Sequence, residues 1–580
     1  MTKWNRPREA RTPSRIRAIA LLGALSCSAS WSISANAATA TCESLTSLTL
    51  PNATITSAQS IPAGTYTPPG FGPITNLPAF CRVVGVIRPT SDSSIGFEVW
   101  MPKSGWNHRF TQIGNGGLAG TYALMYSSTS SMMQRGYAIA GTDDGHTATD
   151  PASWPIGHPE KVKDLAWRAV HETSVASKQV IASFYGTEAR YSYFQGCSTG
   201  GKEAFMEAQR FPEDFDGIIG GAAAMRYTDL IARFVWDEQA QLNDPAGYIP
   251  TSKLPAIQRA ALNACDTVDG IADGVVNDPR QCRFDPGVLQ CPGADNASCL
   301  TAPQVSALRK IYSGPVNPRT GEKIIFGYEP SGENSFGTQT WTAYIAGANG
   351  PTSAAQYTVM NSFNKYLVFE DPNWDFRTFD FDTGVTQMHQ KLDPVPFDAT
   401  SADLSRFQER GGKLLQYHGW IDYSVSPLES IDYYERVLAT HTPGKGNGRG
   451  ERDVAIRRTQ DFYRLFMAPG MNHCAGGDGP NAFGQILSYG LISNTPPPSH
   501  DADHDIVTAL ENWVEKGIAP EKLIATKYTS DDPTKGIQMQ RPLCPYPQKA
   551  RFKGQGSGSS NSAESFTCEV DEDDRGRNSQ

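Results

Sequence analysis

One stretch of 26 residues constrains the fold of this chain more than any other, Arg190 to Phe215, which reads RYSYFQGCSTGGKEAFMEAQRFPEDF. Its aromatic-rich start is typical of a buried strand, and residues 202–210 are good helix formers closed by Phe-Pro. Between them, Gly196, Ser198 and Gly200 fit the G-x-S-x-G elbow, whose small flanking residues allow a strained turn to hold a hydroxyl above a helix N-terminus. The pattern predicts a strand that runs directly into a helix, with Ser198 as a nucleophile; the alternative is an ordinary Gly-Ser loop.

The flanking sequence alternates strand-like and helix-like segments. Strands are expected at 81–88, 95–101, 109–113, 137–141 and 215–221, and apolar residues at helical spacing predict a helix over 164–184. This alternation indicates a parallel sheet covered by helices, an α/β fold.

From about residue 226 to about residue 400 the alternation stops, and the sequence carries scattered aromatics and many Asn, Gly and Pro residues. We interpret this block as a domain inserted between two core strands, a lid above the carboxyl ends of the strands. The predicted organisation is a signal peptide at 1–37, an α/β-hydrolase core at 38–225 and 401–568, a lid domain with a calcium loop at 226–400, and a disordered tail at 569–580.

Two later segments supply an acid and a base. Asp422 follows the strand-like run at 413–417, and His473 follows a second run at 464–468. Serine, then acid, then histidine, each just after a strand, is the chain order of α/β-hydrolases. We expect Asp422 to orient the imidazole of His473, which would take the Ser198 proton and return it to the leaving alcohol. Asp432 and His418 are rivals that we interpret as structural or pocket-lining, and His146, which precedes the serine, as structural.

A glycine cluster follows the strand at 109–113, in the sequence RFTQIGNGGLAG. Glycine allows the backbone of such a loop to approach a substrate oxygen and donate an amide hydrogen. The expected oxyanion hole uses Gly116 or Gly117 with the amide of Thr199; an ordinary Gly-rich turn is the alternative.

The first 37 residues hold six Lys/Arg, a short apolar run from Ala18 to Leu25 and an Ala-Asn-Ala end. This is the pattern of a secretory signal peptide, so the mature protein is expected to be secreted or periplasmic. Removing these six basic residues and one Glu changes the formal net charge from −9 to −14, which argues against nucleic acid as a partner. No other segment approaches membrane-spanning length.

Ten cysteines remain after Cys27 is removed with the leader, an even number in an oxidising compartment, so five disulfides are expected. Proximity in the sequence suggests the pairs Cys42–Cys81, Cys265–Cys282, Cys291–Cys299 and Cys544–Cys568. Cys197, beside the predicted nucleophile, and Cys474, beside the predicted base, are left over.

The lid segment CDTVDGIADGVVNDPRQC carries Asp266, Asp269 and Asp273 on a loop interrupted by glycines. Carboxylates and backbone carbonyls are the oxygen ligands that Ca²⁺ prefers, so a structural calcium site is expected. The carboxylates would act with the carbonyls of Ile271 and Val275. The spacing is not that of an EF-hand, and Asx-turns on an exposed loop are the alternative.

Taken together, GCSTGG around Ser198, YHGWID with Asp422, NHC with His473, the CDTVDGIADG loop and the cysteine pattern resemble the tannase and feruloyl esterase family. That family also includes a hydrolase of mono-hydroxyethyl terephthalate. The resemblance implies an α/β-hydrolase core, a calcium-bearing lid and a disulfide between Cys197 and Cys474 beneath the triad. It further implies hydrolysis of esters of aromatic acids through an acyl-enzyme, with a small aromatic ester, from plant cell walls or tannins, as substrate.

In the terephthalate ester hydrolase a lid arginine holds the free carboxylate of the substrate, but the similar region here, Trp341 to Tyr366, contains no arginine. This favours hydroxycinnamate or gallate esters. Trp341, Phe363 and Trp374 are candidates for stacking on the acyl ring, but we interpret each as a residue of the lid core. A terephthalate monoester hydrolase and a non-catalytic protein that binds phenolics remain as alternatives.

Overall fold

The computed structural model describes residues 40–570, apart from 338, 442–448, 487–494 and 555–558. The predicted signal peptide and residues 571–580 therefore lie outside the described residues. The described residues belong to one compact unit.

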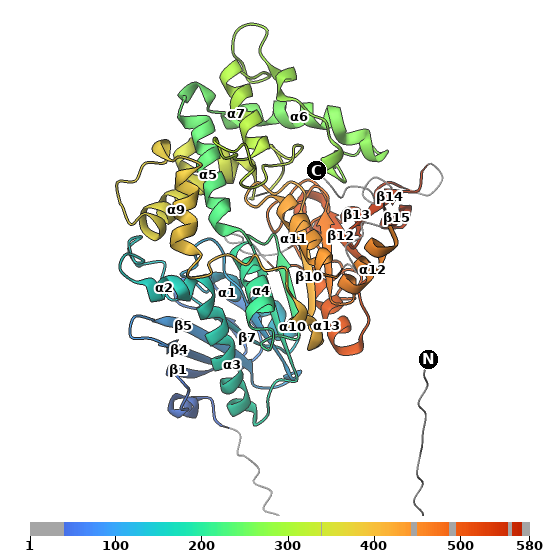
Figure 1. Ribbon diagram of the computed structural model, residues 1–580. Coiled ribbons are helices and arrows are strands. Elements are labelled where there is room, and N and C mark those ends of the chain that lie inside the picture. The colour runs from blue at the N-terminus through green and yellow to red at the C-terminus, as the bar shows by residue number, and fades with distance from the viewer. Residues whose placement is uncertain (1–39, 338, 442–448, 487–494, 555–558, 571–580) are drawn as a thin grey trace, which may run out of the picture. The chain divides into compact units, whose positions relative to one another are not determined.

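A nine-stranded sheet in the order β1-β4-β5-β7-β6-β8-β9-β10-β11 forms the centre of the fold (Figure 1). β1, β4, β5 and β7 pair antiparallel, whereas the pairs from β7 through β6, β8, β9 and β10 to β11 are parallel. The strands of the sheet are β1 (Ala53–Ile61), β4 (Phe80–Ile87), β5 (Ile95–Pro102), β6 (Arg109–Ile113), β7 (Ala138–Thr142), β8 (Tyr191–Cys197), β9 (Gly217–Gly221), β10 (Lys413–Gly419) and β11 (Tyr463–Ala468). The expected α/β-hydrolase core is therefore confirmed, but the sheet is mixed and not parallel throughout. The strands expected at 81–88 and 95–101 pair antiparallel, because the short connection between them cannot hold a crossover helix.

Helices cover both faces of this sheet and build the insertion. They are α1 (Ala123–Gln134), α2 (Pro159–Lys163), α3 (Ala169–Tyr185), α4 (Thr199–Arg210), α5 (Tyr227–Leu242), α6 (Leu254–Cys265), α7 (Ala302–Ser313), α8 (Ala355–Ser362), α9 (Thr383–Leu392), α10 (Ser405–Glu409), α11 (Pro427–Thr440), α12 (Arg449–Gln460) and α13 (Ile506–Lys516). The helix expected over 164–184 begins with a π-helical turn, Asp164–Arg168, before α3.

Successive residues of the parallel strands enter different hydrophobic cores, as the alternation of side chains along a strand requires. Phe194, Ile218, Leu414 and Leu465 join one core with α3, α4 and α11. Their chain neighbours Tyr193, Ile219, Leu415 and Phe466 join the other with α1 and α13. The central strands are thus buried on both faces, which keeps their carboxyl ends in fixed register.

The insertion lies between β9 and β10, which are adjacent in the sheet although nearly 200 residues separate them. Its described part contains helices α5 to α9 and short helical turns, with no assigned strand. It packs onto the loop after β10, because Ile421, Tyr423 and Val425 of that loop belong to the hydrophobic clusters of the insertion. The insertion is therefore in contact with the segment that carries Asp422.

The remaining strands form small antiparallel sheets: β2 (Gly64–Tyr66) with β3 (Ile74–Leu77), β12 (Leu523–Tyr528) with β13 (Ile537–Leu543), and β14 (Gln548–Phe552) with β15 (Phe566–Val570). The disordered tail was predicted from residue 569, which is too early, because Glu569 and Val570 of β15 pair with Lys549 and Gln548 of β14. Among the described residues, none of the helices combines the length and the apolar character needed to span a membrane.

Candidate active site

Ser198 lies in a strained turn between β8 and α4. Its φ of 64° and ψ of −120° place it outside the regions that a non-glycine residue readily adopts. A Cβ at Gly196 would lie 2.2 Å from the carbonyl oxygen of Gly200, and one at Gly200 would lie 2.8 Å from that of Asn115. The glycines of the elbow are therefore required by close backbone approach, and the turn holds the Ser198 side chain at the N-terminus of α4.

His473 and Asp422 come from the loops after β11 and β10, two neighbouring parallel strands. The Nδ1 atom of His473 lies 2.7 Å from Oδ2 of Asp422, and both side chains are buried. Oδ1 of Asp422 accepts hydrogen bonds from the amides of Ser424 (2.7 Å) and Val425 (2.9 Å). This geometry places the hydrogen of the imidazole on Nδ1 and leaves Nε2 as the nitrogen that can accept a proton.

The carboxyl of Asp422 remains ionised although it is fully buried. Burial by itself would raise its pKa, but the facing His473 ring and hydrogen bonds from His418 and His473 hold the pKa well below its ordinary value. A permanent anion at this position stabilises a cationic imidazole when His473 takes up a proton.

A disulfide between Cys197 and Cys474 joins the serine turn to the histidine loop, with Cα atoms 6.0 Å apart. Each cysteine is the immediate chain neighbour of Ser198 or His473. The other disulfides are Cys42–Cys81, Cys265–Cys282, Cys291–Cys299 and Cys544–Cys568, so the ten cysteines pair as the sequence predicts. The Cys197–Cys474 bond fixes the two loops to each other independently of the sheet.

The glycine loop after β6 packs against the elbow. Its Asn115 carbonyl accepts from the Gly200 amide (2.7 Å), and its Gly117 carbonyl accepts from the hydroxyls of Thr199 (2.7 Å) and Tyr227 (3.0 Å). Among the described residues, no group accepts the backbone N–H of Gly116, Gly117 or Thr199. These amides are available to a ligand beside Ser198, as the predicted oxyanion hole requires.

Glu203 on α4 forms a hydrogen bond with this loop, a contact that the sequence did not indicate. Its Oε2 accepts the Asn115 amide at 2.9 Å. Burial raises the pKa of the neighbouring Asp144 well above its ordinary value, and the Glu203 charge raises it further. Burial raises the pKa of Glu203 as well, so protonation within this fully buried acidic pair avoids two adjacent buried charges.

The three rivals from the sequence have different environments. Asp432 pairs with Arg436 on the surface of α11 (3.0 Å). His146 is buried against Trp154, with ring centroids 4.2 Å apart, and burial lowers its pKa to about 4. His418, in contrast, lies 3.1 Å from Oδ2 of Asp422, so it contacts the acid directly.

One lid residue, Tyr344, reaches His473. Tyr344, in the π-helical turn Thr342–Ala346, presents its ring edge-on to His473, with centroids 5.5 Å apart. Trp341 and Phe363 are fully buried in the two lid cores, as the lid-core interpretation expects, and Trp374 stacks on Phe369. Sequence reasoning missed Tyr344 because nothing in its local pattern separates it from neighbouring lid aromatics.

The acidic lid loop gathers three carboxylates. Asp266 accepts from the Gly274 amide (3.0 Å), Asp269 from the Ile271 amide (3.0 Å), and Asp273 from the Val275 amide (3.1 Å) while also pairing with Arg541. Burial, with the charges of its two acidic neighbours, raises the pKa of Asp269 to about 6.

The backbone N–H of Asn277 donates to Asp269, and the buried side-chain Oδ1 of Asn277 has no hydrogen-bond partner. Carboxylates and a buried amide oxygen without a partner are donors of the kind that Ca²⁺ prefers. Asp266, Asp269 and Asp273 are nevertheless not among the groups of described residues whose ligand atoms all lie within 4.8 Å of one another.

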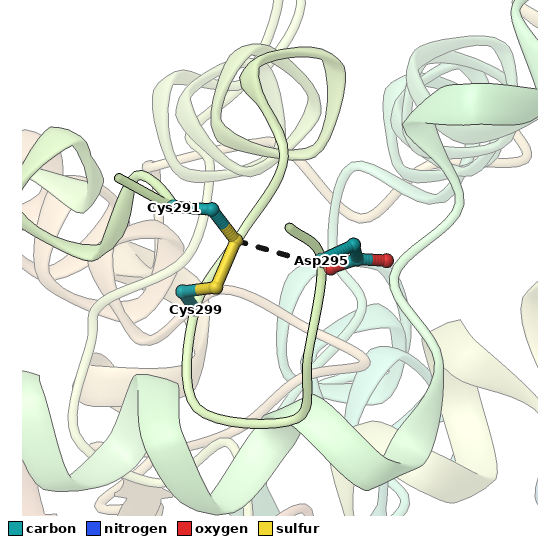
Figure 2. Close-up of side chains that lie close together, drawn as sticks. All are labelled: Cys291, Asp295 and Cys299. Carbon is teal, nitrogen blue, oxygen red and sulfur yellow. Dashed lines mark hydrogen bonds between the residues drawn. A yellow bond between two sulfur atoms is a disulfide. The ribbon is translucent and has the colours of Figure 1, made fainter. Parts of the chain in front are cut away.

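Cys291, Asp295 and Cys299 also lie close together (Figure 2). The two sulfurs are bonded to each other, so neither is a thiolate that could bind a metal, and Asp295 pairs with Lys253. This group is a structural disulfide.

Comparisons with known proteins agree with this geometry. Residues 81–569 match the model of the family described as tannase and feruloyl esterase. An uncharacterized esterase of Xanthomonas campestris is 45% identical over 563 residues, which cover 95% of this chain and 94% of the relative. A probable feruloyl esterase B-2 of Aspergillus terreus is 31% identical and covers 88% of this chain and 91% of its own.

Solved structures give the same result. Feruloyl esterase B from Aspergillus oryzae superposes with a TM-score of 0.78 at 28% identity and covers 91% of this chain and 99% of its own. Tannin acyl hydrolase from Aspergillus niger, at 22% identity, shares the fold with a TM-score of 0.68 and covers 91% of this chain and 93% of its own. The chain therefore belongs to the tannase and feruloyl esterase family of carboxylic ester hydrolases.

Proposed function

We propose that the protein is a secreted serine esterase that hydrolyses esters of aromatic carboxylic acids, feruloyl or galloyl esters, through an acyl-enzyme on Ser198. The observation that carries this proposal is the Cys197–Cys474 bond, which joins a strained serine elbow to a histidine whose Nδ1 is bonded to a buried, ionised Asp422. The names of the relatives, feruloyl esterase and tannin acyl hydrolase, support the substrate class.

In this mechanism, the Ser198 hydroxyl attacks the ester carbonyl carbon while Nε2 of His473 takes its proton. The carbonyl oxygen becomes an oxyanion and accepts from the amide of Thr199 and from that of Gly116 or Gly117. The tetrahedral intermediate collapses to the acyl-enzyme, and the alcohol leaves with the proton from His473. A water molecule, deprotonated by His473, then attacks the acyl carbon, and collapse of the second intermediate releases the acid and restores Ser198.

We also propose that the acidic lid loop holds a structural Ca²⁺ through Asp266, Asp269 and Asp273 with the carbonyls of Ile271 and Val275. Its contribution would be to neutralise the carboxylates and fix the loop. The five disulfides and the apolar leader pattern support secretion.

The test compares the wild type with Ser198→Ala on methyl ferulate, methyl gallate and mono-hydroxyethyl terephthalate, with labelling by a fluorophosphonate probe. We expect labelled wild type, an unlabelled and inactive variant that remains folded, and higher kcat/KM on the ferulate or gallate ester. Full activity of Ser198→Ala would refute the mechanism, and a preference for the terephthalate ester would replace the substrate assignment. A wild type without labelling or turnover would leave a non-catalytic phenolic-binding protein.

A further inference from the structure

A second histidine shares the carboxylate of the triad. His418 lies near the end of β10, and its side chain is fully buried. Its Nε2 is 3.1 Å from Oδ2 of Asp422 and 3.0 Å from the carbonyl oxygen of Val425. An ionised carboxylate and a backbone carbonyl can only accept, so Nε2 of His418 must carry the hydrogen.

The opposite side of the ring faces a buried chain of hydroxyl and amide groups. Nδ1 of His418 is 2.7 Å from Oγ of Ser430, which is also 2.7 Å from Nε2 of Gln416. The Oε1 of Gln416 accepts from the hydroxyl of Tyr463, whose pKa burial raises well above its ordinary value, so that hydroxyl keeps its proton. Ser430 accepts from the Gln416 amide, and among the described residues Nδ1 of His418 is the other polar atom within hydrogen-bond distance of its hydroxyl, so the hydroxyl proton points at Nδ1.

The direction of every hydrogen bond in this chain is thereby set. Donation runs from Tyr463 to Gln416, Ser430 and His418, and ends on Asp422, and the four side chains before Asp422 are fully buried. Such a chain fixes a neutral imidazole with its hydrogen on Nε2.

The two carboxylate oxygens of Asp422 have different hydrogen-bond partners. Oδ1 is occupied by two backbone amides, whereas Oδ2 is shared by His418 and His473. The other charged or titratable groups nearby are Tyr328 and Glu429, which both interact electrostatically with Asp422, and Arg233 of the lid. Arg233 donates to the Ser424 carbonyl and lies 3.7 Å from Glu429. Within the described residues, His418 is thus the one side chain besides His473 that donates to Asp422.

We propose that His418 is a positioning residue of the esterase, a neutral Nε2–H imidazole that holds the Asp422 carboxylate in place and moderates its charge toward His473. The proposal rests on the proposed function for its kinetic part. Without this donor the carboxylate binds a protonated His473 more tightly, so the base becomes free only at higher pH.

The kinetic test compares His418→Ala, His418→Gln and wild type by pH profiles of kcat/KM on methyl ferulate. Loss of a hydrogen bond to a charged group predicts a roughly tenfold lower kcat for His418→Ala, with KM little changed. The acid limb of its profile should move up by about 0.5–1 pH unit. His418→Gln carries an amide donor and should recover most of both effects. His441→Gln is the matched control, because His441 bonds Gln408 (2.9 Å) away from the triad and should leave the profile unmoved.

An unmoved acid limb in folded His418→Ala, or an equal shift in His441→Gln, would overturn the proposal. If His418→Ala fails to fold, Ser430→Ala decides the matter. This variant keeps His418 but removes the hydroxyl at Nδ1, so a smaller shift in the same direction supports the chain and no shift overturns it.

A readout without catalysis separates this proposal from the proposed function. In ¹⁵N-histidine-labelled protein, the resonance that disappears in His418→Gln should show a bare Nδ1 and a protonated Nε2 between pH 6 and 8. A hydrogen on Nδ1, or a charged ring, would refute the tautomer even in an active esterase. If the wild type hydrolyses no ester, the proposed function fails while the tautomer is still measured.

Discussion

Removal of the Cys197–Cys474 disulfide by the double change Cys197→Ser and Cys474→Ser tests how the active site is held together. The two cysteines are 277 residues apart in the sequence, whereas Cys291 and Cys299 are 8 apart. In the chain-entropy model these loops correspond to about 5.6 and about 2.5 kcal/mol of stabilisation, so the two removals should differ by about 3 kcal/mol.

Activity should separate the two variants more strongly. The Cys197–Cys474 bond sets the serine turn against the histidine loop, and a shift of about 1 Å between catalytic groups costs about 10²-fold in rate. Removal of Cys291–Cys299, which lies in the lid, should leave kcat within about twofold.

The assay combines urea unfolding, which gives the free energy of unfolding, with kcat on methyl ferulate under conditions where each variant is folded. A Cys197→Ser/Cys474→Ser variant that is folded and fully active would refute the positioning role of the bond. Equal destabilisation by the two removals would refute the loop-length reasoning.

Three further changes have defined outcomes. Asp422→Asn should lower kcat by about 10³–10⁴. Because the folded pKa of Asp422 lies below its unfolded value, the contribution of Asp422 to stability is present above about pH 4 and is lost as the pH falls. The free energy of unfolding of the variant should therefore decline less in acid than that of the wild type, and an equal decline would contradict this. Gly196→Ala, whose Cβ would lie 2.2 Å from the carbonyl oxygen of Gly200, should lower the free energy of unfolding by about 2 kcal/mol or more, whereas Gly72→Ala, with open space around it, should stay within about 0.5 kcal/mol; equal urea midpoints for the two would argue against the close-contact account. Chelation with EGTA should lower Tm by several degrees, with recovery on adding Ca²⁺, and Asp269→Asn should abolish this response; a wild-type Tm indifferent to EGTA would count against the calcium site.

Much of the fold follows from local sequence patterns. The predicted strands and helices of the core appear within a few residues of their expected positions, because apolar periodicity reports directly on which segments are buried on two faces or one. The serine elbow could also be predicted from the sequence. Gly196 and Gly200 are required there by close backbone contacts within a few residues of Ser198 and with the loop beside it.

Contacts between distant segments were less accessible. The sequence indicated the extent of the lid but not its internal order. Its interpretation of Trp341 and Phe363 as lid core agrees with their burial, but it did not indicate Tyr344, which reaches His473. An aromatic residue in an irregular segment has no periodic signal that tells buried from site-facing.

The sequence by itself determined the order of the candidate site residues along the chain. It shows a serine in a glycine elbow, an acid and a histidine after later strands, and one cysteine beside the serine and one beside the histidine. Only the tertiary structure decided that His418 donates to Asp422, that Glu203 bonds the glycine loop and that Tyr344 lies against His473. The physical reason is that parallel strands bring their carboxyl ends to one edge whatever the intervening length, whereas the hydrogen bonds and ring contacts made there depend on the three-dimensional packing of loops and lid.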